Sequence, residues 1–173
     1  MSVVACEIPS ISDLNRDAVG SVTFHDCYRA PLAHLDLGIV DIFFAVFGHH
    51  PLWVKLLLIV RNVVAKRAGL ETPTVAEIMS PEIRDRYRVG DKIGPWPIFS
   101  IGETEIIAGR NNRHMDFRLS VLKQIDGERG SVFVSTVCMV HNIYGKLYLW
   151  FIIPFHRNGV RLLMSNAIAA KRL

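Results

Sequence analysis

Several features that would identify a functional class are scarce or absent in this chain of 173 residues. It has only three cysteines, Cys6, Cys27 and Cys138, and their spacing matches neither a zinc site nor a thiol-exchange motif. We therefore expect a reduced protein of the cytoplasm, with no metal and no cofactor. The first residues lack a basic start and an apolar core, so no signal peptide is predicted.

A strong charge of one sign is also missing. The formal net charge is +4, the basic residues are scattered, and no helix-turn-helix or zinc-finger pattern is present, so we expect no nucleic-acid partner. The glycines between Gly90 and Gly94 do not have the spacing of a phosphate-binding loop. No sequence signature of a Ser-His-Asp hydrolase or of a reactive cysteine is visible either.

Long hydrophobic runs are absent, although half of the residues are hydrophobic and the mean hydropathy is +0.27. The two most apolar stretches, 37–47 and 147–153, are far shorter than the roughly 20 residues that cross a bilayer. The excess of apolar residues therefore has three explanations, which stay open: a large core, a lined cavity, or a face that meets a membrane or a partner.

The first half of the chain predicts one strand followed by two helices. We expect an irregular lead-in over 1–20 and a strand over 22–28 with alternating side chains. Asp36 is expected to cap a helix that runs to Phe47. A second helix is predicted from Pro51 to Gly69, because apolar residues recur there at helical spacing.

The second half predicts an antiparallel meander and a long terminal helix. A short helix is expected over 81–87, after which the apolar period changes to two. The strands are expected at Trp96–Ile101, Glu105–Ala108, His114–Lys123 and Ser131–Val140. The last helix is expected from Asn142 to Lys171, with a kink or a restart at Pro154.

This order predicts a single α+β domain over 1–173 with a helix-grip architecture, in which a curved antiparallel sheet wraps around a long C-terminal helix. Two helices follow the first strand. The order of elements resembles that of the START and SRPBCC superfamily. A likeness of topology carries no function by itself.

The strand that begins at His114 has the sharpest local pattern. His114, Asp116, Arg118 and Ser120 alternate with apolar residues, so they are expected on one face of the sheet. This row is either a solvated polar face or the wall of a cleft. In a cleft, His114 and Asp116 could act as catalytic acid and base, and Arg118 could hold an anion.

Two further histidines come later in the chain. His141 and Asn142 stand between the last strand and the helix, and His156 and Arg157 lie within that helix. Asn142 is expected to cap the helix, and the histidines are either separately hydrogen-bonded or gathered around one ligand. On the second reading, at least two of His114, His141 and His156 share a pocket.

Together these segments resemble a bacterial family of uncharacterised proteins, the domain of unknown function 2867. The resemblance extends from about Leu35 to the C-terminus, and members of the family look like helix-grip proteins. The motifs that carry it are Pro51-Leu-Trp-Val, Arg88-x-Gly90-Asp91-x-Ile93-Gly94-Pro95-Trp96, His114-x-Asp116-Phe117-Arg118, His141-Asn142-x-x-Gly145, Tyr148 and Pro154-Phe155-His156-Arg157.

The function that we predict is binding of a small, largely apolar molecule with a polar or anionic group, in a cavity between sheet and C-terminal helix. The expected ligand-binding residues are Trp53, Trp96, Phe117, Arg118, His141, Tyr148, His156 and Arg157. One alternative is a cyclase, hydratase or isomerase that uses His114 and Asp116. Another is a peripheral protein that meets a membrane surface or a partner, and a homo-oligomer also stays open.

Overall fold

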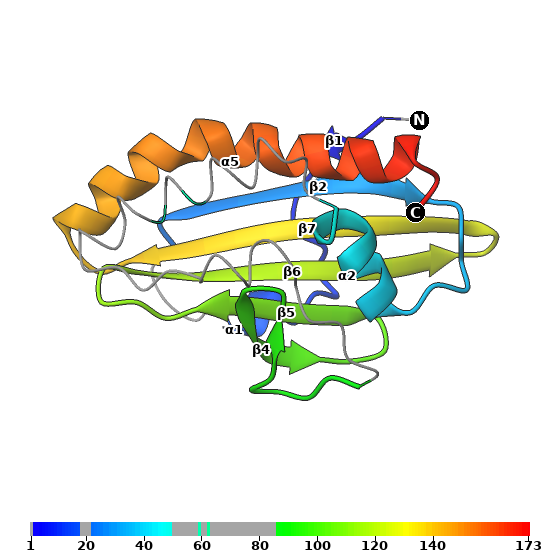
Figure 1. Cartoon of the computed structure of the whole chain (residues 1–173), viewed down its shortest axis with the longest axis horizontal. Helices are drawn as coiled ribbons and strands as arrows, with labels where there is room; N and C mark the ends of the chain where they lie inside the picture. Colours follow the sequence, from blue (N-terminus) through cyan, green and yellow to red (C-terminus); the bar gives the residue numbers. More distant parts are fainter. Residues whose placement is uncertain (1, 18–21, 50–58, 60–61, 63–85) are drawn as a thin grey trace.

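The computed structural model describes residues 2–17, 22–49, 59, 62 and 86–173 of the chain (Figure 1). Its centre is one antiparallel sheet with the strand order β1-β2-β7-β6-β5-β4-β3. The strands are β1 (Val4–Ala5), β2 (Phe24–Leu32), β3 (Lys92–Ile93), β4 (Trp96–Ile101), β5 (Glu105–Arg110), β6 (Met115–Asp126) and β7 (Arg129–Val140). The predicted meander is therefore confirmed, and β2 joins it by pairing with β7.

Helices complete the predicted α+β architecture. The described helices are α1 (Leu14–Asp17), α2 (Ile39–Phe47) and α5 (Ile143–Ala169). The long helix α5 runs along the sheet beside β2, and α2 crosses the same face nearer the C-terminus of the chain (Figure 1). This is the expected arrangement of a curved open sheet packed on a long terminal helix.

The N-terminal lead-in is more ordered than the sequence suggested. Residues expected to be irregular form β1, which pairs with β2, and the short helix α1. Two-residue β1 and β3 are too short to show an alternating pattern, so no periodicity predicts either of them. The helices predicted over 51–69 and 81–87 lie outside the described residues, apart from 59, 62 and 86–87.

The capping prediction for α2 was wrong. The helix begins at Ile39 and its N-cap is Gly38, which has no side chain to accept a hydrogen bond. Asp36 lies before this position and caps nothing there. The loop is held instead by Lys123, whose Nζ donates to the carbonyl oxygens of Leu35 and Leu37 at 2.7 Å each.

Of the kink or restart expected at Pro154, the restart is contradicted by α5. The helix continues through the proline from Ile143 to Ala169. Proline removes the N–H that would bond to the carbonyl of Trp150, one turn earlier. Because both residues are exposed, that carbonyl can be hydrated, and the missing bond does not end the helix.

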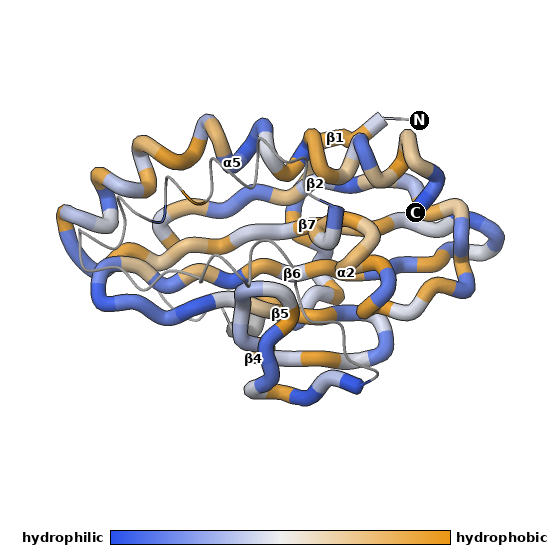
Figure 2. Tube along the Cα trace, viewed as in Figure 1, coloured by the Kyte–Doolittle hydropathy of each residue, from blue (hydrophilic) through white to orange (hydrophobic). Residues whose placement is uncertain are grey.

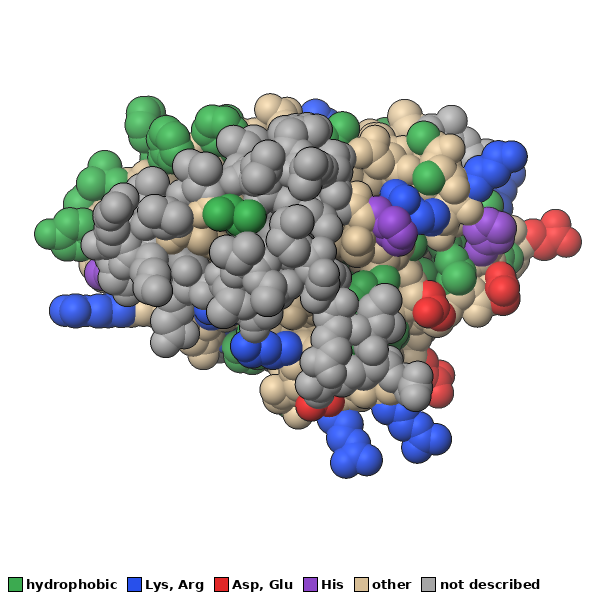
Figure 3. All heavy atoms as spheres, viewed as in Figure 1, with side chains coloured by type: hydrophobic (Ala, Val, Ile, Leu, Met, Phe, Trp, Pro, Cys, Tyr) green, Lys and Arg blue, Asp and Glu red, His purple; other side chains and the backbone are tan. Residues whose placement is uncertain are grey.

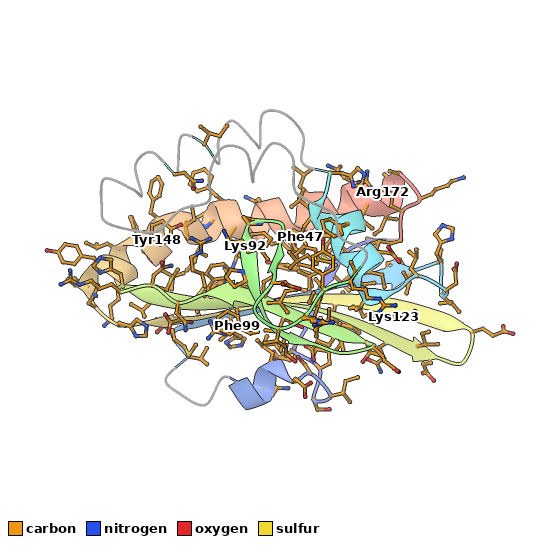
Figure 4. The ribbon with its side chains drawn as sticks, turned by 60° about the horizontal axis from the view of Figure 1, so that its bottom comes forward. Phe47, Lys92, Phe99, Lys123, Tyr148 and Arg172 are labelled. Carbon is orange, nitrogen blue, oxygen red and sulfur yellow. The ribbon has the colours of Figure 1, made fainter. Side chains whose placement is uncertain are left out.

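The main core lies between the sheet and the helices. It contains apolar residues of β2, β5, β6 and β7 that face α2 and α5. Phe47 points from α2 into this layer, whereas Phe99 lies on the opposite side of the sheet (Figure 4). There, Leu14 and other residues of the N-terminal segment cover Ile107 and Val137, so both faces of the central strands are buried.

Candidate functional site

The two sides of β6 separate the predicted site residues into two groups. Phe117 packs with the apolar residues that face α5. Arg118 lies on the other side, with its guanidinium 3.6 Å from the centre of the Phe99 ring. Because neighbours along a strand point to opposite faces, Phe117 and Arg118 cannot line the same cavity.

At the end of the sheet where α5 begins, His114, Asp116, His141 and Asn142 form what we call the sheet-end cluster. Nε2 of His141 lies 3.1 Å from Oδ2 of Asp116, and both side chains are partly exposed. Oδ1 of Asp116 accepts a bond from the backbone N–H of Asn112. The side chain that contacts the carboxylate of Asp116 is thus His141, whereas one described partner of Arg118 is the side-chain oxygen of Asn111.

Asn142 organises the other half of the sheet-end cluster. Its Oδ1 accepts from the N–H of Gly145, as expected for a helix N-cap, and lies 3.1 Å from Nδ1 of His114. Its Nδ2 donates to the carbonyl oxygen of Arg113. The N–H of His141 donates to the carbonyl of His114, so the start of α5 is tied directly to the start of β6.

A second carboxylate–imidazole pair lies between α5 and the sheet. Nε2 of His156 is 3.4 Å from Oδ1 of Asp26, whose side chain is only 9% exposed. The hydroxyl of Tyr28 donates to the other carboxylate oxygen of Asp26 at 3.5 Å. With Thr136, these residues form what we call the interface cluster.

Thr136 is the Cα partner of Asp26 across β2 and β7, and the two side chains share one face. Its hydroxyl oxygen is buried and has no hydrogen-bond partner in the described structure. Burial, together with the neighbouring Asp26 carboxylate, raises the pKa of Tyr28, which keeps the Tyr28 hydroxyl protonated as a donor.

Apolar side chains surround the interface cluster. The ring of Phe24 meets the imidazole of His156 edge to face, with centroids 6.1 Å apart. Phe24 and Leu149 pack together on one side, and the main core begins at Tyr28 on the other. The guanidinium of Arg157 lies 5.5 Å from the centre of the Phe24 ring and reaches solvent.

Two of the predicted wall residues do come together. The rings of Trp96 and Phe117 are in edge-to-face contact at 6.4 Å, and Trp96 also contacts Phe43 and Phe47 of α2. Tyr148 lies in the first half of α5 (Figure 4). Trp53 lies outside the described residues.

The three histidines do not share one location. His114 and His141 are neighbours in the sheet-end cluster, but their rings contact different partners, Asn142 and Asp116. His156 lies 13 residues after the start of α5, which corresponds to about 20 Å along the helix. Among the described residues, no group of three His, Cys, Asp or Glu side chains could hold a metal ion.

A buried polar group that the sequence analysis missed lies on the opposite face of the sheet. The carboxylate of Glu105 accepts hydrogen bonds from the hydroxyls of Ser12 and Ser120, each at 2.5 Å, and from the N–H of Asp13 at 2.7 Å. We call Ser12, Glu105 and Ser120 the N-terminal clasp. The sequence feature that could have indicated this buried carboxylate is the single acidic residue at the start of the apolar strand 105–108.

The cysteines were also closer than their spacing suggested. The sulfur atoms of Cys6 and Cys27 are 3.3 Å apart, and the N–H of Cys6 donates to the carbonyl of Cys27. Burial raises the pKa of Cys27 to about 12, and burial also raises the pKa of Cys138 to about 12. Neither buried thiol is therefore expected to react while the protein is folded at neutral pH.

We expect diamide at pH 8 to join Cys6 to Cys27 slowly, because the partly exposed Cys6 can be oxidised first and its neighbour is close, whereas the raised pKa of Cys27 leaves little thiolate to complete the bond. Thiol titration after denaturation should then find Cys138 as the remaining free thiol. The Cys27→Ser variant should form no internal disulfide. Equal oxidation of the Cys6→Ser variant would contradict the pairing.

Comparison with known proteins identifies relatives at the family level. The family model described as "Protein of unknown function (DUF2867)" matches residues 18–162, which is most of the chain. A search among curated proteins gives no match. The matched region contains all of the interface cluster and the sheet-end cluster but not Ser12 of the N-terminal clasp.

Proposed function

The chain belongs to the DUF2867 family, and we propose that it binds a small, largely apolar molecule between the sheet and α5, with a hydrogen-bonding group of that molecule at His156. The observation that carries the proposal is the Asp26–His156 pair inside an otherwise apolar layer. Burying polar groups in such a layer costs stability that apolar side chains of similar size would not. A binding role for His156 would account for the presence of a polar pair at this position.

The arrangement of the imidazole supports this assignment. In the neutral imidazole, donation from Nε2 of His156 to Oδ1 of Asp26, 3.4 Å away, selects the tautomer that carries its proton on Nε2. Nδ1 then has a free lone pair, and no described residue occupies it. A hydroxyl or N–H of a bound molecule could donate to this nitrogen, and the unpartnered hydroxyl of Thr136 is a second polar group of the same cluster.

The aromatic residues support the apolar part of the ligand. Phe24 lies directly against His156, and Phe117 belongs to the same apolar group, which continues to Trp96. Flat aromatic rings beside a few fixed polar groups are typical of small-molecule sites. A polar or anionic group on the ligand could also be reached by Arg157 from the solvent side.

The alternative is an enzyme on the same scaffold. For a reaction at the sheet-end cluster, the pair that could move a proton is Asp116 with His141, because these two side chains are in contact. His114, expected to be the acid or base, has its Nδ1 beside Asn142. The alternative therefore keeps Asp116 and assigns the proton transfer to His141.

Binding of the probe 1-anilinonaphthalene-8-sulfonate to the folded protein tests the proposal. We expect saturable one-to-one binding, and His156→Gln should weaken it about tenfold, the effect of one hydrogen bond to a ligand. Gln can still donate to Asp26 but has no ring Nδ1. The matched control is Asn158→Ala, an exposed change two residues further along α5.

The native protein should also release a co-purified small molecule in native mass spectrometry, and His156→Gln should reduce its amount. Equal probe affinity in wild type, His156→Gln and Asn158→Ala would contradict the assignment of the site. Thermal unfolding of each variant shows whether the fold is retained, so that a loss of binding can be attributed to His156 itself.

A further inference from the structure

The first half of α5 exposes an unusual set of large apolar side chains. Six of them are between 60% and 78% exposed, and we call them the α5 stripe: Ile143, Tyr144, Leu147, Trp150, Phe151 and Phe155. Hydrophobic side chains protrude at this end of the molecule in Figure 3, and the tube along the same part of α5 alternates between hydrophobic and more polar residues in Figure 2. Single exposed apolar residues are ordinary, but a contiguous patch indicates a contact surface.

The positions of these residues show that they form one face. At about 100° per residue they fall within an arc of about 140° on the helix. The residues of α5 that are buried against the protein, among them Gly145, Leu149 and Val160, lie on the opposite side. The helix therefore has an inner apolar face that packs on the sheet and an outer apolar face that the described structure leaves exposed.

The charged residues of α5 itself are all basic. Residues 129–173 contain six Lys or Arg residues and no Asp or Glu. Lys146 and Arg157 are exposed on α5 next to the stripe. Arg113 is also exposed, and it lies near the start of α5 because its carbonyl oxygen accepts a hydrogen bond from Asn142. An occupant of this surface must be apolar at its centre and negatively charged around it.

We propose that the α5 stripe docks on the surface of an anionic lipid bilayer, with α5 lying parallel to the membrane plane. Trp, Tyr and Phe are suited to the boundary between headgroups and acyl chains, and Lys and Arg beside them attract anionic headgroups. The stripe is a ridge on one helix, which a fluid bilayer can accommodate.

A second copy of the chain fits this surface less well. A two-fold contact through the stripe would place Lys146 and Arg157 of both copies near one another, and the C-terminal 45 residues have no carboxylate side chain to compensate them. In the described part of the chain, no helix has both the length and the apolar character to span a bilayer. The proposed contact accordingly lies on the membrane surface.

Sedimentation with vesicles of phosphatidylcholine, with and without phosphatidylglycerol, tests this proposal. We expect binding to the anionic vesicles, with a blue shift of the emission of Trp150, and at least tenfold weaker binding for the Leu147→Ser, Phe151→Ser double variant. The matched control is Ile125→Ser, an exposed apolar residue of β6 that lies outside α5. Lys146→Glu should weaken binding, whereas Lys171→Glu, just beyond the C-terminal end of α5, should not.

Each other outcome overturns the proposal in a defined way. Equal binding to uncharged vesicles would show that the basic residues do not contribute to membrane binding. Equal loss in Ile125→Ser would show that the stripe is not the contact. Self-association of the wild type that the double variant abolishes, without vesicle binding, would assign the stripe to a second copy. Because the stripe faces away from His156, failure here leaves the proposed ligand site intact.

Discussion

Replacing Glu105 with alanine should lower the free energy of unfolding by about 4 kcal/mol, since hydrogen bonds to a charged group contribute more than neutral ones and buried donors left without an acceptor are costly. The carboxylate accepts from three donors, two hydroxyls and the N–H of Asp13, within a site that is 7% exposed. Alanine would remove this acceptor from the two buried hydroxyls and from the partly buried N–H of Asp13. Urea denaturation measures the change.

Two further variants test whether this loss is specific to the carboxylate of Glu105 or would follow any substitution near the start of β5. Glu103→Ala removes the same kind of side chain two residues earlier, where it is exposed, and should change the free energy of unfolding by less than about 0.5 kcal/mol. Glu105→Gln keeps one acceptor oxygen and should give an intermediate loss. If Glu105→Ala unfolds at the same urea concentration as Glu103→Ala, the N-terminal clasp does not stabilise the fold.

The second large effect is expected at Gly145, in the first turn of α5. A Cβ added there would lie 2.2 Å from the carbonyl oxygen of His114 and 3.0 Å from a methyl group of Val140. The backbone cannot yield easily, because Asn142 and His141 tie the same turn to β6. We expect Gly145→Ala to lower the free energy of unfolding by about 3 kcal/mol, the range of steric overpacking.

The same helix provides the control for this prediction. A Cβ at Gly159 would meet nothing within 4 Å, so Gly159→Ala should stabilise the protein by about 0.5–1 kcal/mol through helix propensity alone. Opposite signs in thermal or urea unfolding would show that the close approach of α5 to β6 matters. A loss of similar size at both positions would contradict the steric explanation.

The elements with a regular apolar period could be predicted from the sequence. The four strands of the meander and the long terminal helix were placed correctly, because alternation and helical spacing persist over many residues there. Elements with little or no period were missed, namely β1, β3 and α1. The start of α2 was misplaced because a residue of capping type, Asp36, stands two residues before the true N-cap, Gly38.

The site was predictable only where its contacts are local. Asn142 as a helix cap and the proximity of His114 and His141 follow from the order of the elements. The partner of His156, Asp26, lies 130 residues away, and no local pattern indicates it. Grouping Phe117 with Arg118 was a different error, because the alternation that identified the strand also places those two side chains on opposite faces.

The pairing of β2 with β7 has a consequence for the order in which the protein can be assembled during synthesis. Residues 24–32 of β2 bond to residues 130–138, so the loop to be closed is about 100 residues long. Among the described strands, the two-residue β1 is the one that can pair with β2 until β7 has been translated. Non-local pairing of this kind slows folding and exposes a strand edge to other chains.

The sequence of β2 disfavours pairing with other chains before β7 is available. Between its buried positions it carries Arg29 and Pro31, and neither favours pairing with a foreign strand: the arginine adds charge and the proline lacks an N–H. When β7 pairs with β2, Pro31 lies opposite Ser131. On the other side of β2, the pairing with β1 extends no further than Arg29, so β1 does not need a hydrogen bond from the backbone of residue 31. The two residues can thus protect the nascent chain while costing the finished sheet little.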